Sequence, residues 1–226
     1  MKHTTVALVL FTGIMGNAHA QIIKKSNGYL FRMKFTKGAI VHYQADSVAG
    51  GLGANGQGIK FGLPIVWKVL DVKSGIATVE ATIGPVLLGE QQVMKASVTK
   101  VQLNSQGKPV APSTGAQQLT PVLPAAPIKP GATWTASLPM TSPAGGMKKT
   151  INATYKFTGI KSVEGKQVAV INVSTTGESK GSGVIYLLVS DGSLYQSTLN
   201  MDVTVSPQAG TTSTYKITAK VKRVKG

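Results

Sequence analysis

The chain has 226 residues, no cysteine, and a formal net charge of +16 from 24 basic and 8 acidic side chains. The lack of cysteine excludes disulfides, thiol catalysis and cysteine metal sites. The positive balance favours anionic partners, such as phospholipid or lipopolysaccharide head groups, acidic cell-wall polymers or extracellular nucleic acid. It is equally compatible with plain solubility close to a negatively charged surface.

The first 20 residues have the pattern of a cleaved secretory signal. Lys2 precedes an apolar run from Val6 to Ile14, and Ala-His-Ala follows at residues 18–20. The apolar run is shorter than the roughly 20 residues that a membrane-spanning helix needs. We therefore expect a signal peptide at residues 1–20, a secreted or periplasmic bacterial protein, and no transmembrane segment.

The mature chain begins with patterns typical of half-buried β-strands. In YLFRMKF, residues 29–35, aromatic and apolar side chains alternate with Arg32 and Lys34. A glycine-rich segment at residues 50–58 and short turn motifs such as KSG at residues 73–75 separate the strands that follow. This organisation predicts a first β unit at residues 21–108.

A proline-rich segment divides the chain into two halves. Residues 109–130 hold six of the eleven prolines, which favours an extended connector. Beyond it, TINATYKFT at residues 150–158 and LYQSTLNMDVTV at residues 194–205 again alternate. We therefore predict a second β unit at residues 131–226, which could form one domain with the first. The fold class is all-β, with antiparallel, hairpin-rich sheets.

Three stretches of the first unit resemble three of the second, in the same order: FTKGAIVHYQA (35–45) and IKPGATWTAS (128–137), WKVLDVKSG (67–75) and YKFTGIKSVEG (155–165), VTKVQLNSQG (98–107) and GVIYLLVSDG (183–192). These echoes predict a two-fold internal repeat, whose sheets either pack as a sandwich or continue into a curved half-barrel. Trp67, Trp134 and Tyr155 are the expected structural anchors, because large aromatic side chains usually supply core area.

The C-terminal half also carries a family resemblance. IKPGATW at residues 128–134, GKQVAVINV at 165–173 and GSGVIYLLVSDGSLYQSTLNMDV at 181–203 resemble uncharacterised secreted bacterial all-β proteins with a Lys-Pro-Gly-x-x-Trp strand start. The resemblance implies no known activity. In architecture alone, the pattern is similar to the curved-sheet lipoprotein carriers of the bacterial envelope.

Several catalytic motif matches lack the context that their chemistry requires. GESKG at residues 177–181 makes Ser179 a formal nucleophile, but neither a helix nor a histidine follows it. GLGANG at residues 51–56 fits a dinucleotide pattern, but a predicted strand follows instead of a helix. His42 and Asp46 share a strand face about 13 Å apart, which is too far for direct pairing.

Metal patterns are absent from the sequence. His42 is the single histidine after the signal, and the acidic residues have no calcium-loop spacing. We therefore predict no catalytic residue, no cofactor and no metal site. A hydrolase with an unrecognised acidic pair, such as Glu80 with Glu90, is an open alternative.

The basic residues show more order. YKITAKVKR at residues 215–223 alternates apolar and basic side chains, and the first strand presents two further cations outward. If the two termini pair, one basic face results, with the members Arg32, Lys34, Lys216, Lys220 and Lys222. Few aromatic residues are interleaved, which argues against nucleic acid as a partner.

Two functional hypotheses follow. The first is a non-enzymatic binding or scaffolding protein of the bacterial envelope, whose curved sheets offer an apolar concavity to a lipid-like ligand. The second is an interaction protein whose basic surface docks on anionic envelope polymers.

Overall fold

The computed structural model describes residues 21–50, 58–88, 91–110, 121–141, 148–176, 179–190, 192–205 and 213–225. Within these residues every regular element is a β-strand. No helix in the described part is long and apolar enough to cross a membrane. The signal peptide expected at residues 1–20 lies outside the described residues, as does most of the glycine-rich segment.

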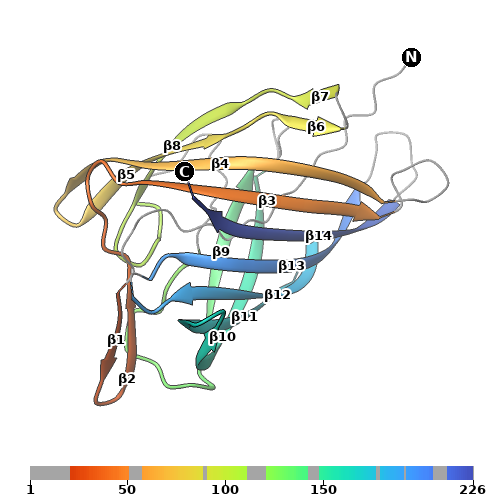
Figure 1. Ribbon diagram of the computed structural model, residues 1–226. Coiled ribbons are helices and arrows are strands. Elements are labelled where there is room, and N and C mark those ends of the chain that lie inside the picture. The colour runs from red at the N-terminus through yellow and green to blue at the C-terminus, as the bar shows by residue number, and fades with distance from the viewer. Residues whose placement is uncertain are drawn as a thin grey trace.

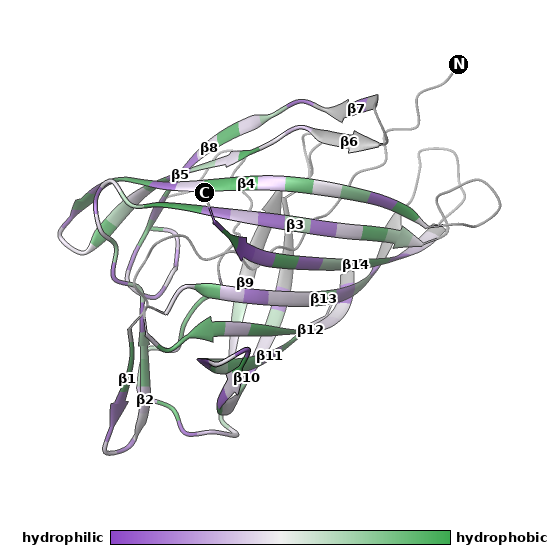
Figure 2. Ribbon diagram, in the orientation of Figure 1, coloured by the Kyte–Doolittle hydropathy of each residue, from purple (hydrophilic) through white to green (hydrophobic). Residues whose placement is uncertain are grey.

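Side chains alternate between buried and exposed along most of the strands, and Figure 2 shows the corresponding alternation of hydropathy along β3, β4 and β14. The strands of the described residues are β1 (Gln21–Lys25), β2 (Gly28–Arg32), β3 (Ile40–Gly50), β4 (Ile59–Lys73), β5 (Ile76–Ile83), β6 (Val86–Leu88), β7 (Gln91–Met94), β8 (Ser97–Leu103), β9 (Thr133–Thr141), β10 (Lys148–Val163), β11 (Lys166–Thr176), β12 (Ser179–Leu188), β13 (Leu194–Val205) and β14 (Ser213–Val224). The prediction of an all-β, antiparallel, hairpin-rich fold is confirmed.

Ten strands form one antiparallel sheet in the order β8-β5-β4-β3-β14-β13-β12-β11-β10-β9. The pairs β1–β2 and β6–β7 form separate two-stranded sheets. The large sheet curls, so that β9, β10 and β11 lie behind β12 to β14 (Figure 1). The two predicted β units therefore continue into a single curved sheet instead of packing as a sandwich, and the pairing of β3 with β14 joins them.

One face of this sheet, the inner face, carries the hydrophobic core. Strands from both halves contribute large side chains that are less than 2% exposed, among them Tyr43, Leu63, Ile65, Tyr155 and Ile171. The opposite, outer face carries most of the polar and charged side chains. Such one-sided burial is what period-two alternation in an antiparallel sheet produces.

The N-terminal hairpin and the end of the connector cover part of the inner face. The rings of Tyr29 and Phe31 both meet Phe157 edge to face, at centroid distances of 5.5 and 5.1 Å. Leu123 of the connector is 1% exposed, and Ile128 forms an antiparallel bridge with Tyr29. This end of the connector therefore packs against the core and does not act only as a linker between the two halves.

Two of the sequence echoes share a local geometry. The amide of Gly38 donates to the carbonyl of Val69 (2.9 Å), and the amide of Gly131 donates to the carbonyl of Phe157 (2.7 Å). Directly after each acceptor, the register of its strand shifts by one residue. Both glycines have a positive φ, which glycine adopts without steric cost. A duplication of the whole unit stays a prediction.

The three aromatic anchors lie on or beside the core. Trp67 and Tyr155 are 3% and 1% exposed, while Trp134 is half-buried at the start of β9. The Trp134 indole stacks on Tyr155 at a centroid distance of 5.3 Å, and its Nε1 donates to the carbonyl of Val122 (2.7 Å). This side chain therefore links the second half of the sheet to the connector.

Replacing Trp134 tests that link. We expect W134A to lower the free energy of unfolding by about 3 kcal/mol, because both the stack and the hydrogen bond are lost. W134F keeps an aromatic ring against Tyr155 and should lose only about 1 kcal/mol with the hydrogen bond. Urea unfolding measures both values. Equal losses in the two variants would contradict a role for the stack.

Three buried polar atoms on the inner face, Ser47 Oγ, Trp67 Nε1 and Ser197 Oγ, have no hydrogen-bond partner among the described residues. An unpaired buried hydroxyl costs stability, so S197A should leave the free energy of unfolding unchanged or raise it by up to about 3 kcal/mol. Ser193 is the matched control, because its buried Oγ accepts a hydrogen bond from Arg223. We expect S193A to be destabilising in the same urea titration. A clear loss of stability in S197A would contradict this assignment.

Candidate binding site

Four of the five residues of the expected basic face lie on two different sheets, and Lys34 lies just beyond the end of β2. Arg32 and the neighbouring Lys34 belong to the N-terminal hairpin region, whereas β14 pairs with β3 and β13. Arg32 is half-buried and donates to the carbonyls of Phe31, Pro124 and Ala125, so its guanidinium holds the connector in place. The strand pairing that would join these five residues into one face is not observed.

The three lysines of β14 are exposed on the outer face, but each lies near an acidic residue. Lys220 is opposite Asp46 of β3 and Lys216 is opposite Asp202 of β13. Lys222 forms an ion pair with Glu164 (3.8 Å). Opposite charges on neighbouring strands offset each other's field, so this stripe presents less positive potential than its lysines alone suggest.

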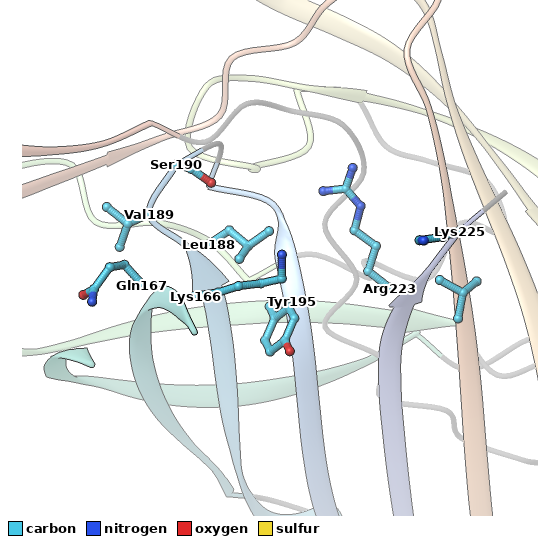
Figure 3. Close-up of a pocket in the computed structure, with 9 residues that line it drawn as sticks. Lys166, Gln167, Leu188, Val189, Ser190, Tyr195, Arg223 and Lys225 are labelled. Carbon is cyan, nitrogen blue, oxygen red and sulfur yellow. The ribbon is translucent and has the colours of Figure 1, made fainter. Parts of the chain in front are cut away.

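A different group of basic residues lines a cleft of about 740 Å³ at one end of the sheet. It lies where the β10–β11 turn, the β12–β13 turn and the end of β14 meet, and Figure 3 shows Lys166 and Tyr195 on one side with Arg223 and Lys225 on the other. The lining residues are Lys166, Gln167, Leu188, Val189, Ser190, Tyr195, Arg223, Val224 and Lys225. None of these described residues is acidic; Asp191, next to Ser190 in the chain, is outside the described part.

The wall that carries Lys166 is held by a polar clasp, formed by Glu164, Tyr195 and Lys222. The turn at Glu164 and Gly165 has positive φ at both residues, as a tight two-residue hairpin requires. A register shift between β12 and β13 leaves Tyr195 as an extra residue, and its hydroxyl donates to Glu164. Because Glu164 also pairs with Lys222, the clasp ties the β10–β11 turn to β13 and β14.

The clasp changes the acid–base behaviour of the tyrosine. Hydrogen bonding to Glu164, followed by burial and by the negative charge of Glu164, raises the pKa of the Tyr195 hydroxyl above its ordinary value. The hydroxyl therefore stays protonated and occupied as a donor at neutral pH.

Arg223 has a fixed position in the opposite wall. It follows Ala219 and Val221 on the inner face of β14, at the point where that face reaches the end of the sheet. Its Nη1 donates to Ser193 Oγ (2.7 Å), and Ser193 is 1% exposed. A guanidinium that is already oriented loses less conformational entropy when it binds a carboxylate or phosphate group.

These groups are suited to holding an anion. Three cationic side chains line one concavity, Lys166 from the start of β11 and both Arg223 and Lys225 from the end of β14. Aliphatic side chains such as Leu188 and Val189 provide an apolar part of the lining. Charge-assisted hydrogen bonds from arginine and lysine are among the stronger polar contacts that a protein can offer to an oxyanion.

The other residues singled out in the sequence lie elsewhere. Ser179 begins strand β12, and no helix follows it in the described chain. Glu80 forms an ion pair with Lys100 (3.6 Å) on neighbouring strands, and Glu90 is outside the described residues. His42 lies on the outer face of β3, next to the end of β14. Among the described residues, no three potential ligands come together to hold a metal ion.

The sequence contained a signal for one of the missed cleft residues. In YKITAKVKR the apolar positions of the strand are Tyr215, Ile217, Ala219 and Val221, and Arg223 occupies the next position of that series. A charged residue in phase with buried positions indicates a strand that reaches the rim of its sheet. Lys166 and Lys225 carry no comparable signal, because only the tertiary structure brings them to the cleft.

Comparison with known proteins adds no assignment: no protein-family model matches the chain, and no curated protein matches it significantly. The resemblance of its C-terminal half to secreted all-β proteins therefore stays a hypothesis.

The clasp predicts a pH-dependent contribution to stability. Because the pKa of Tyr195 is raised in the folded state, its contribution is fully present below the ordinary tyrosine pKa of about 10 and is lost as the pH rises through the folded value. We expect Y195F to be less stable than the wild type at pH 8, and the difference to shrink as the pH rises above about 10.

Urea unfolding between pH 8 and pH 11 measures this difference. E164Q is the informative second variant, since it removes the charge and weakens the tie to Lys222 while leaving the tyrosine in place. A constant difference between wild type and Y195F over the whole pH range would contradict the clasp.

Proposed function

We propose that this chain is a non-enzymatic binding protein of the bacterial envelope, which holds an anionic group in the cleft between Lys166, Arg223 and Lys225. The observation that carries the proposal is that Lys166, at the start of β11, and Arg223 and Lys225, at the end of β14, line one cleft of about 740 Å³. Clefts of roughly 300–1,000 Å³ are the usual size for small-molecule sites.

The side chains of the cleft favour binding over chemistry. Nucleophilic or acid–base catalysis needs a base within hydrogen-bond reach of the reacting group. Among the lining residues, the Tyr195 hydroxyl has a raised pKa and is already engaged with Glu164. The lysine and arginine side chains of the lining carry positive charge and donate hydrogen bonds. An oxyanion bound here would be held and neutralised.

The cleft suits this role better than the inner face does. The described inner-face side chains are largely buried in one core, and Phe31 and Leu123 cover part of it. It also suits the role better than the lysine stripe of β14, whose charges have acidic neighbours. The proposed envelope location supports this role, because a secreted protein meets anionic lipids and polymers there.

Calorimetric titration with inorganic phosphate tests the proposal. Loss of one charge-assisted contact should reduce the affinity by about tenfold, so K166A and K225A should each bind phosphate roughly that much more weakly. R223K keeps the charge but not the planar guanidinium and should also bind more weakly. Binding should weaken further as sodium chloride is raised, because salt screens exposed charges.

Lys60 provides the matched control. It is an exposed lysine of β4, at the end of that strand remote from the cleft, and K60A changes the net charge by the same amount as K166A. We expect K60A to bind phosphate as the wild type does. A similar loss in K60A, or no measurable binding by the wild type, would overturn the proposal.

A further inference from the structure

A second groove adjoins the cleft around the end of β14. It has a volume of about 340 Å³ and is lined by Ile40, Val41, His42, Arg223, Val224 and Lys225. The last three of these residues also line the larger cleft. The two concavities therefore share the final residues of β14 as a common wall, with the β10–β11 turn on one side and the start of β3 on the other.

The second groove differs in chemistry from the first. Ile40 is 48% exposed and Val224 is 41% exposed, and both are among the few well-exposed large apolar side chains of the described residues. They come from neighbouring strands, because Val224 pairs with His42 in the register of β14 with β3. When an apolar ligand covers exposed aliphatic side chains in a groove, their surface is removed from water, which makes the free energy of binding more favourable.

We infer that the joined groove binds an anionic amphiphile, with its anionic head between Lys166, Arg223 and Lys225 and its alkyl chain along Val224 toward Ile40. This inference rests on the proposed anion binding and adds the class of ligand. The shared residues decide the geometry: Arg223 and Val224 each line both concavities, and because successive side chains of a strand point to opposite faces, the two concavities meet around the end of β14.

The arrangement selects for a molecule with both parts. A small inorganic anion leaves Ile40 and Val224 exposed to water, so it gains nothing from the second groove. A neutral hydrocarbon gains nothing from the three cations. An alkyl phosphate or a single-chain phospholipid satisfies both, because a methylene chain next to a charged head crosses from one concavity into the other at Val224.

A series of alkyl phosphates with two to ten carbons, used below the concentrations at which they form micelles, tests the inference by calorimetric titration. Each added methylene that enters the groove should raise the affinity about two- to fourfold, with the upper value for full burial. I40S and V224S should flatten this dependence on chain length. I40S should not change the affinity for inorganic phosphate, which reports on the cationic cleft alone, because Ile40 lines only the second groove.

V98S is the matched control, because Val98 is an exposed valine (59%) on β8, far across the sheet from the groove. It should keep the full dependence on chain length. Wild-type affinity that rises with chain length and falls in I40S and V224S but not in V98S supports the inference. Equal affinity for all chain lengths, or equal losses in V98S, overturns it.

The two proposals fail in different ways. If inorganic phosphate binds and chain length has no effect, the anion site stands and the amphiphile assignment is wrong. If neither phosphate nor any alkyl phosphate binds, both are wrong. Competition with vesicles of phosphatidylglycerol identifies the source of the ligand: displacement of bound octyl phosphate assigns a bilayer lipid, and its retention assigns a free amphiphile. Sedimentation with the vesicles in the absence of any alkyl phosphate binding overturns the inference.

Discussion

The pairing of β3 with β14 is the contact on which the rest of the structure depends. It runs from Gly50 opposite Lys216 to His42 opposite Val224 and joins the N-terminal strands to the C-terminal ones in one sheet. Without it, each group would expose an apolar face. The same register places the end of β14 beside the start of β3, which creates the second groove, and the end of β14 also forms part of the cleft. Fold and candidate site thus share one set of backbone hydrogen bonds.

Local irregularities then shape this end of the sheet. Bulges increase the twist of a strand and redirect its side chains. Thr158 is the extra residue in β10, just before the part of that strand that leads to the β10–β11 turn, and Tyr195 is the extra residue in β13. Glu164, at the tip of the β10–β11 hairpin, reaches Tyr195 on β13, which is two places from β11 in the sheet. The basic cleft lies beside this contact, and Tyr195 is one of its lining residues.

The sequence predicted the local features of the fold, namely its strands and hairpins. Alternating side chains identified the strands, and glycine-containing turns identified the hairpins, because one-sided burial and positive φ leave a direct mark on residue type. The order of strands in the sheet leaves no such mark, since residues far apart in the chain form the central pair. Arg32 shows the limit: alternation predicted an outward cation of a basic face, but the side chain is half-buried and its guanidinium donates to the carbonyls of Pro124 and Ala125. No pattern in its own strand encodes those contacts. Arg223 could have been noticed, as a charge in phase with the buried positions of its strand.

Net charge did not locate the candidate site either, and the reason is electrostatic. An excess of lysine and arginine raises the potential over the whole surface, and any local maximum depends on where the few acidic residues lie. The β14 stripe has the most regular lysines, but Asp46, Asp202 and Glu164 lie next to them. The described lining of the cleft has its cations at strand ends, where neighbouring strands no longer place an acidic partner opposite each one. The one acidic residue of the clasp, Glu164, is engaged with Tyr195 and Lys222. In a chain this basic, a surface with the greatest number of lysines can therefore still be the weaker site for an anion.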